Sequence, residues 1–325
     1  MAFLTEHRSQ LWLVVALAAC FVLSLFEHSI SPYYYTVIIY IGVNIILASS
    51  LNLINGFAGQ FSLGHAGFMA IGAYTSAYCT QTFQAQPDTL SGNVLFLIAL
   101  LIAGLVAAVF GVLVGIPSLR LKGDYLAIVT LGFGEIIRVI IQNLDFLGGA
   151  RGFTGIPEIT NFAWVFCLAA VLIFMIANLV RSTYGKGFLA VADDEISAEA
   201  MGINSTYYKV VAFVTGAFFA GMAGGLYAHF VTYVNPAQFG FIKSIELVVM
   251  VIVGGMGNTI GVILAAALLT ILPEALRPIA QYRMVIYSLM LVIIMITRPQ
   301  GLFGHGLWMK KMWRRYAHAP RGAES

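Results

Sequence analysis

The chain has 325 residues, of which 60% are hydrophobic and only 10% are charged, and its formal net charge is +3. Soluble domains carry about 25% charged residues, so this chain has too few polar side chains to cover a surface that faces water. The composition excludes an ordinary soluble domain and indicates a protein that lies largely in the lipid bilayer.

Apolar runs recur along the whole chain. A membrane-spanning helix needs about 20 mostly apolar residues. The first run is not followed by a clear cleavage site, so we expect a retained helix rather than a removed signal peptide. The predicted fold is an all-α polytopic membrane protein with a single transmembrane domain over residues 1–325. Its expected segments are 11–26, 33–54, 67–84, 94–116, 125–143, 162–180, 208–231, 244–254 with 260–272, and 284–297.

Glycine-rich sequence interrupts two of these apolar regions, after residue 54 and after residue 253. Non-helical backbone survives at membrane depth only where protein or water satisfies its polar groups. Interrupted segments in both halves of a chain indicate a transport pathway. We therefore expect residues 244–272 to enter the membrane and return as two short helices. The pathway or helix-break candidates are Gly56, Gly59, Gln60, Gly64, His65, Gly254, Gly255, Gly257 and Asn258.

Lysine and arginine in short loops predict which side of the membrane each loop occupies. The basic loops are 117–124 and 181–209, and residues 305–325 form a basic tail. With a broken 244–272 segment the chain has about ten membrane segments, and both termini lie in the cytoplasm. Arg151 is an exception to this pattern. A basic tail beside an apolar run predicts a cytoplasmic flank rather than a nucleic-acid site.

The longest polar stretch between predicted spans is residues 181–209. Residues 190–201 contain neither Gly nor Pro, which predicts a short helix, and Gly202 is well placed to end it. Acidic residues 193–195 favour the N-terminal end of that helix. Two interpretations stay open from the residues alone: a solvated hairpin, or a short amphipathic helix that docks on a partner protein.

Ionisable residues inside apolar segments are costly in lipid. Glu135 and Arg138 are three residues apart and can pair on one helix face, and Lys243 and Glu246 repeat this spacing. We expect internal ion pairs at both places. His65 and His229 lack companion ligands, so no metal site is expected.

Motifs for catalysis are absent from the sequence. The segment Gly185-Lys186-Gly187 lacks the earlier glycine and the following Ser or Thr of a phosphate-binding loop, and no such loop occurs elsewhere. The three cysteines are widely spaced and support neither a disulfide framework nor a zinc site. We therefore expect no enzyme activity and no cofactor in this chain.

Several blocks, in order over residues 40–304, resemble the LivM-type permease subunits of branched-chain amino-acid ABC importers. The most specific is RLKGDYLAIVTLGFGEIIR at residues 120–138, and GFAGQFSLGHAGF at residues 56–68 is another. The remaining blocks are residues 46–53, 152–156, 190–204, 254–258 and 298–304.

This resemblance implies a permease subunit, with a fold similar to type II ABC importer permeases, in the bacterial inner membrane. It would translocate leucine, isoleucine and valine by alternating access. The implied partners are a LivH-like permease, LivG-like and LivF-like ATPases that hold ATP and magnesium, and a periplasmic amino-acid-binding protein, with no nucleic acid. Residues 181–209 would be a cytoplasmic coupling loop that meets an ATPase through Ala192, Asp193, Asp194, Glu195, Ala198, Ala200, Met201, Gly202 and Asn204.

Two other functions stay open. Sibling permeases on the same scaffold carry urea or short amides, and a self-sufficient secondary transporter would need no ATPase. Genes for an ATPase and a binding protein beside this one would favour the importer.

Overall fold

The computed structural model of the chain describes residues 13, 17, 18, 20 and 24, and then 31–87, 89–118, 123–277, 282–297 and 301–302. Most of the predicted first span and the whole predicted tail, 305–325, lie outside the described residues. Within the described part the regular secondary structure is helical, and an isolated antiparallel bridge joins Phe153 to Val234. The predicted all-α class is confirmed there.

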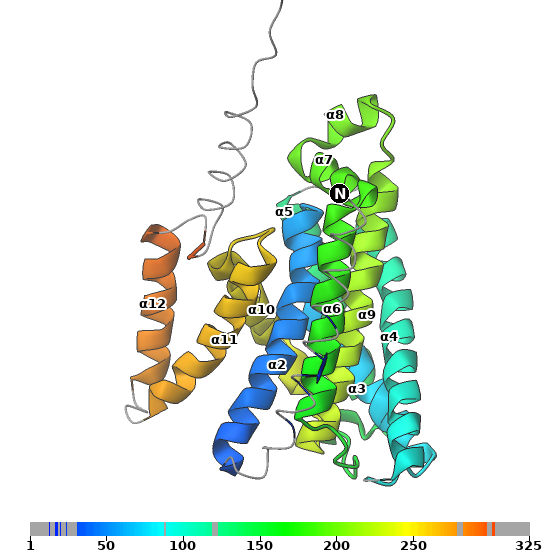
Figure 1. Ribbon diagram of the computed structural model, residues 1–325. Helices are drawn as coiled ribbons and strands as arrows, with labels where there is room; N and C mark the ends of the chain where they lie inside the picture. The colour runs from blue at the N-terminus through cyan, green and yellow to red at the C-terminus, as the bar shows by residue number, and fades with distance from the viewer. Residues whose placement is uncertain are drawn as a thin grey trace, which may run out of the picture.

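The helices follow one another through short connections (Figure 1). In chain order they are α2 (Pro32–Asn52), the π-helical turn η2 (Leu53–Phe57), α3 (His65–Thr82), α4 (Leu90–Ser118), α5 (Asp124–Gln142), η3 (Asp145–Leu147), η4 (Gly149–Arg151), α6 (Phe162–Arg181), α7 (Thr183–Asp193), α8 (Glu195–Ala200), α9 (Ser205–Val231), η5 (Pro236–Phe239), α10 (Phe241–Gly254), α11 (Thr259–Ala275) and α12 (Arg283–Thr297).

Six of the described helical stretches are long and apolar enough to cross a membrane. The chain is therefore a multi-pass membrane protein, whereas the total of about ten segments stays a prediction. The six stretches are Pro32–Phe57, Leu90–Pro117, Tyr125–Gln142, Phe162–Arg181, Ser205–Val231 and Pro236–Gly254.

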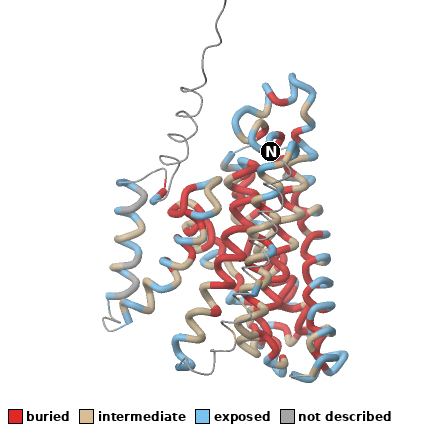
Figure 2. Tube along the Cα trace, in the orientation of Figure 1, coloured by how far each residue is buried: buried red, intermediate tan, exposed pale blue. Residues whose placement is uncertain are grey.

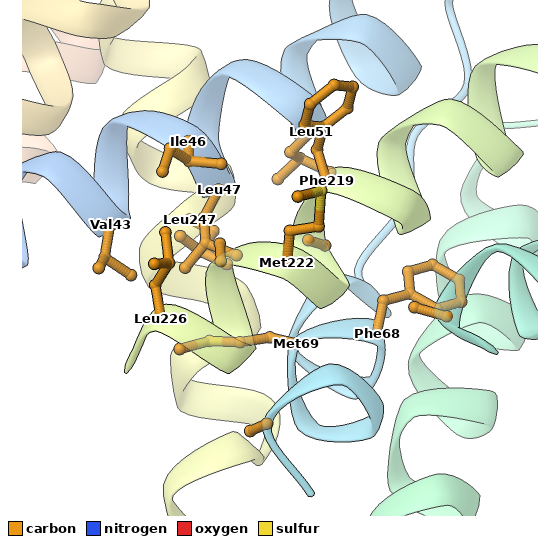
Figure 3. Close-up of a cluster of buried hydrophobic side chains, with 14 of the residues drawn as sticks. Val43, Ile46, Leu47, Leu51, Phe68, Met69, Phe219, Met222, Leu226 and Leu247 are labelled. Atoms are coloured by element: carbon orange, nitrogen blue, oxygen red, sulfur yellow. The ribbon is translucent and has the colours of Figure 1, made fainter. Parts of the chain in front are cut away.

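Helix α9 lies at the centre of the bundle and packs against α2, α3 and α4. Most of the buried residues belong to these central helices, whereas α12 lies to one side and packs on α11 (Figure 2). One apolar cluster joins four elements (Figure 3): it contains Val43, Ile46, Leu47 and Leu51 of α2, Phe68 and Met69 of α3, Phe219, Met222 and Leu226 of α9, and Leu247 of α10.

Small residues allow the central helices to approach closely. A Cβ built on Gly72 of α3 would lie 2.0 Å from the carbonyl oxygen of Gly221 on α9. A Cβ on Gly224 would lie 2.0 Å from the carbonyl oxygen of Met69. Lipid tails are as apolar as leucine, so helices in a bilayer associate through such close packing rather than through the hydrophobic effect.

Helices α10 and α11 form the predicted broken segment. Helix α10 ends at Gly254, the chain turns, and Asn258 caps the start of α11 by accepting a hydrogen bond from Gly261 N at 3.3 Å. The two helices pack against each other, so the chain enters the bundle and returns. Helices α7 and α8 lie at one end of the bundle, which we call the α7–α8 end.

Candidate functional site

The predicted single helix over residues 190–201 is wrong, because the segment forms two helices that meet at Asp194. The backbone of Asp194 is extended, and its side chain accepts hydrogen bonds from Ile196 N at 2.9 Å and Ser197 N at 3.1 Å. An Asp side chain that caps the following turn competes with continuation of the preceding helix. Asp193 is therefore the last residue of α7 rather than part of a helix N-terminus.

Gly202 ends α8, as the sequence predicts. This glycine has a left-handed φ of +83°. Gly202 N donates to Glu199 O at 2.9 Å and Ile203 N donates to Ala198 O at 3.0 Å. These two bonds form a Schellman motif, in which a left-handed residue satisfies the last carbonyls of the helix.

Two polar contacts hold α8 against the first turns of α9. Lys209 Nζ lies 2.5 Å from Glu195 Oε1, and only 2% of the Lys209 side chain is exposed. The Ser205 hydroxyl donates to the Glu199 carboxylate. Because a buried lysine requires a partner, these contacts fix the position of α8.

The exposed surface of α8 and its C-terminal cap carries two large apolar side chains. Ile196 is 72% exposed and Met201 is 82% exposed, while Ala198 on the opposite face is buried. Ala200 and Asp193 are also exposed, Ala192 is half-buried, and Asn204 caps α9 by accepting from Tyr207 N at 3.0 Å. The predicted coupling residues thus divide into an exposed group and a group that positions α8. Ile196 is not among the predicted coupling residues, although a large apolar side chain in a polar loop favours a contact with a partner protein.

Helix α7 connects this surface to the first helix break. Phe188 of α7 packs with Ala58 and Ala212 in a small apolar cluster. Gly59, whose φ is +65°, lies so close to α7 that a Cβ built on it would be 3.0 Å from Ala192 Cα. A shift of α7 would therefore displace Ala58 and Gly59, which directly follow η2.

The two predicted helix breaks pack directly on each other. A Cβ built on Gly56 would lie 2.2 Å from Gly257 N. Asn52 Oδ1 accepts a hydrogen bond from Gly257 N at 2.9 Å. Gly255 lies next to Gly301, because a Cβ on Gly301 would be 2.5 Å from Gly255 N. The structure thus brings Gly56 and Gly257 together, while Asn52 was missed by the sequence pattern.

The irregular segment before α3 is held by side chains from three other elements. The Asn55 amide accepts from Ser62 N at 3.2 Å, and Thr130 Oγ1 of α5 accepts from Leu63 N at 3.0 Å. Ser244 Oγ of α10 accepts from Ala66 N at 3.3 Å, in the first turn of α3. The Gln60 amide donates to Ala58 O at 3.4 Å, and a Cβ on Gly64 would lie 2.3 Å from Thr130 O.

His65 and His229, the two histidines of the apolar segments, each lie within hydrogen-bond distance of a hydroxyl group. His65 Nε2 lies 2.9 Å from Ser50 Oγ, and His229 Nε2 lies 2.7 Å from Thr80 Oγ1. Within the part of the chain that the structure describes, no three His, Cys, Asp or Glu residues gather as a metal site requires.

Glu135 and Arg138 form an ion pair that also reaches α10. Arg138 Nε lies 2.7 Å from Glu135 Oε2, as their spacing predicts. Glu135 Oε1 accepts a hydrogen bond from Phe241 N at 3.1 Å. Helix α10 has no side-chain cap of its own, so Glu135 of α5 satisfies its first N–H.

We expect the changes Glu135→Gln and Arg138→Gln to be coupled. Either single change leaves the other charge without its partner. The double variant should therefore lose less stability than the sum of the two single losses. Thermal unfolding of the purified subunit measures this difference, and the pair in contact should show a coupling of about 0.5–3 kcal/mol. Additive losses would show that the two side chains act independently.

Comparison with known proteins places this architecture in a family. Residues 33–296 match the model of the family described as the permease component of the branched-chain amino acid transport system. The chain is 37% identical over 295 residues to the high-affinity branched-chain amino acid permease protein LivM of Salmonella typhimurium, covering 80% of this chain and 67% of that protein. It is 23% identical over 318 residues to a probable LivM of Methanocaldococcus jannaschii, covering 82% and 92%.

The chain is also similar to permease proteins that carry a second name, LivH. The chain is 23% identical over 282 residues to the LivH permease protein of Escherichia coli, covering 80% of this chain and 90% of that protein. No solved structure matches the chain. The family model covers most of the chain and agrees with the multi-pass helical fold. This chain belongs to the family of permease components of branched-chain amino acid transport systems, and it is a transport subunit rather than an enzyme.

Proposed function

We propose that this chain translocates leucine, isoleucine and valine as one permease subunit of an ATP-driven, binding-protein-dependent importer. Membership of the permease family supports this proposal, as do the relatives named LivM. The membrane is the bacterial inner membrane. Both termini and the α7–α8 end face the cytoplasm, which agrees with the basic loops in the sequence.

The proposed complex contains a second, LivH-like permease. This chain is similar to proteins of both names, which is what two related halves of one membrane channel would show. Each half would meet one ATPase, LivG-like or LivF-like, and ATP and magnesium would be held there. A periplasmic binding protein would deliver the amino acid to the opposite end.

The two exposed apolar side chains of α8, Ile196 and Met201, are the observation that carries the coupling role. Ile196 and Met201 are large, apolar and exposed at the end of the bundle, on a helix fixed by the Lys209–Glu195 pair. A rigid apolar helix face suits a groove on a partner protein. An ATPase that pulls on α8 would move α7, and α7 touches the first break at Ala58 and Gly59.

This path gives a mechanism for alternating access. Motion of α7 reaches Gly59, which lies just after η2, and Gly56 of η2 packs on Gly257 in the second break. Side chains satisfy backbone N–H groups in both breaks, which is the condition for non-helical backbone at membrane depth. ATP binding and hydrolysis would thus open and close the pathway through the two breaks.

We expect the double change Ile196→Glu and Met201→Glu to release the ATPases. Both side chains are exposed, so the fold of the permease should be unaffected. Charging two anchors of an interface typically costs about 2 kcal/mol or more, which is about a 30-fold loss of affinity. Co-purification of ATPase with permease and ATP-dependent leucine uptake should both fall.

Gln86→Glu is the control, because it adds one negative charge at an exposed position between α3 and α4, away from α8. That variant should keep its ATPases. Normal ATPase binding by the Ile196 and Met201 double variant would refute the assignment of α8 as the docking element.

A further inference from the structure

Four polar side chains from three helices meet beside the broken segment. Lys243 Nζ of α10 lies 3.3 Å from Glu246 Oε2 and 3.3 Å from Asn44 Oδ1 of α2. Asn44 Nδ2 donates to Thr270 Oγ1 of α11 at 2.9 Å. We call Asn44, Lys243, Glu246 and Thr270 the α10 polar cluster.

The α10 polar cluster lies near the middle of the bundle. Asn44 is twelve residues beyond the start of α2, which places it about 18 Å along the 26-residue stretch Pro32–Phe57. Helix α10 also begins deep in the bundle, because its first N–H bonds to Glu135. Glu135 lies about 16 Å along α5, counted from Asp124. The charges of Lys243 and Glu246 therefore lie at membrane depth, close to the midplane.

Lys243 and Glu246 are partly exposed in the isolated chain, and charged side chains at this depth cannot be in contact with lipid. The Lys243 side chain is 23% exposed and that of Glu246 is 44% exposed in the isolated chain. Charged side chains at the centre of a bilayer are costly and face a water-filled cavity or the interior of a protein bundle. The side of the bundle formed by α2, α10 and α11 must therefore face a pathway or another subunit.

We propose that the α10 polar cluster is a binding site for the zwitterionic backbone of an α-amino acid during its passage. This inference rests on the proposed function. The Lys243 ammonium would bind the carboxylate of the solute, and the Glu246 carboxylate would bind its ammonium group. A solute with both charges can replace the internal pair without leaving either side chain unpaired, which is the condition for a charged site at low dielectric.

The other two members of the cluster fit this role. Asn44 accepts from Lys243, so it keeps the ammonium oriented while Glu246 turns to the solute. Thr270 holds the Asn44 amide in the orientation that this contact requires. The cluster recognises the amino-acid backbone and not the apolar side chain, so it would serve leucine, isoleucine and valine alike. A neutral solute such as urea carries no charge with which to replace either partner of the Lys243–Glu246 pair.

The first test removes both charges at nearly constant volume with Lys243→Gln and Glu246→Gln. The complete complex is reconstituted in vesicles with the binding protein and radiolabelled leucine. We expect uptake to fall by about tenfold or more, while complex yield and ATP hydrolysis stimulated by the loaded binding protein stay at the wild-type level. Glu274→Gln is the control, because Glu274 lies one turn beyond Thr270 at the C-terminal end of α11, where it is a polar partner of Tyr33 and not of the cluster. Its uptake should be unchanged.

A second test retains both charges. In a chain whose three cysteines are replaced by serine, Thr270→Cys should react with a water-soluble cationic thiol reagent in the assembled complex. Leu268→Cys, an exposed apolar position on the same helix, should react slowly, because two residues of helix separate it from Thr270 and turn it to a different side of α11. Equal, slow labelling at both positions would overturn the proposal even if the double glutamine variant fails to assemble.

The outcomes separate this inference from the proposed function. If the wild-type complex does not accumulate leucine, the proposed function fails. If wild-type uptake is normal and the double glutamine variant transports equally well, only the binding site is refuted.

Discussion

Replacing Gly56 with valine is expected to separate the two helix breaks and to destabilise the permease. A Cβ at this position would lie 2.2 Å from Gly257 N and 2.2 Å from Asn52 Oδ1. The added side chain must therefore displace backbone, and the Asn52 to Gly257 hydrogen bond is lost with it. Overpacking costs about 1–3 kcal/mol and the hydrogen bond about 1 kcal/mol.

Thermal unfolding in detergent measures this loss. A total of about 3 kcal/mol corresponds to a fall in melting temperature of about 4 °C for a chain of 325 residues, at about 2.1 cal/mol/K of unfolding entropy per residue. Gly132→Val is the matched control, because a Cβ on Gly132 of α5 has no neighbour within 4 Å. If Gly56→Val and Gly132→Val melt at the same temperature, the breaks do not depend on their close contact.

The second large effect is expected for Gly202→Ile at the end of α8. The φ of Gly202 is +83°, and a Cβ there would meet no neighbouring atom within 4 Å. The cost is therefore that of the backbone alone, about 1–2 kcal/mol for an ordinary residue and more for a β-branched one. The Schellman bonds should open and Met201 should leave its position in the exposed face.

We expect ATP-driven uptake by the Gly202→Ile complex to fall by about tenfold, for a loss of about 1.4 kcal/mol in docking, with normal membrane insertion. Gly202→Asn is the control, since Asn tolerates a left-handed conformation, and it should retain most of the uptake. Wild-type uptake by the isoleucine variant would show that the geometry of this turn has no part in coupling.

Local patterns in the sequence predicted the features that depend on neighbouring residues. The spacing of Glu135 and Arg138 predicts their ion pair, and the glycines at 254–257 predict the turn between α10 and α11. Gly202 is recognisable as a helix end because its requirement for positive φ is local. Each of these features is decided within one or two helical turns.

Features that depend on distant residues could not be predicted. Asn52 binds Gly257 across 205 positions of sequence, and nothing in either segment identifies the other. The start of α10 deep in the bundle depends on Glu135, which lies on a different helix. The sequence pattern indicates a charge in a solvated loop at Lys209, whereas the structure pairs Lys209 with Glu195 and buries it.

The prediction of one helix over residues 190–201 is wrong for a different reason. Both a continuous helix and a capped second helix satisfy the local pattern of residues 190–201. The tertiary contacts of α7 with Ala58 and of α8 with Lys209 favour the split form. Packing selects between two forms that the local pattern allows, as is usual for short helices.

The most direct test of the central claim is leucine uptake by purified components in sealed vesicles. The vesicles contain this chain and a LivH-like permease, with or without the two ATPases inside and with a leucine-loaded binding protein outside. We predict accumulation of leucine only when ATP, magnesium and both ATPases are present on the α7–α8 side. Accumulation without the ATPases would contradict the claim and identify the chain as a self-sufficient transporter.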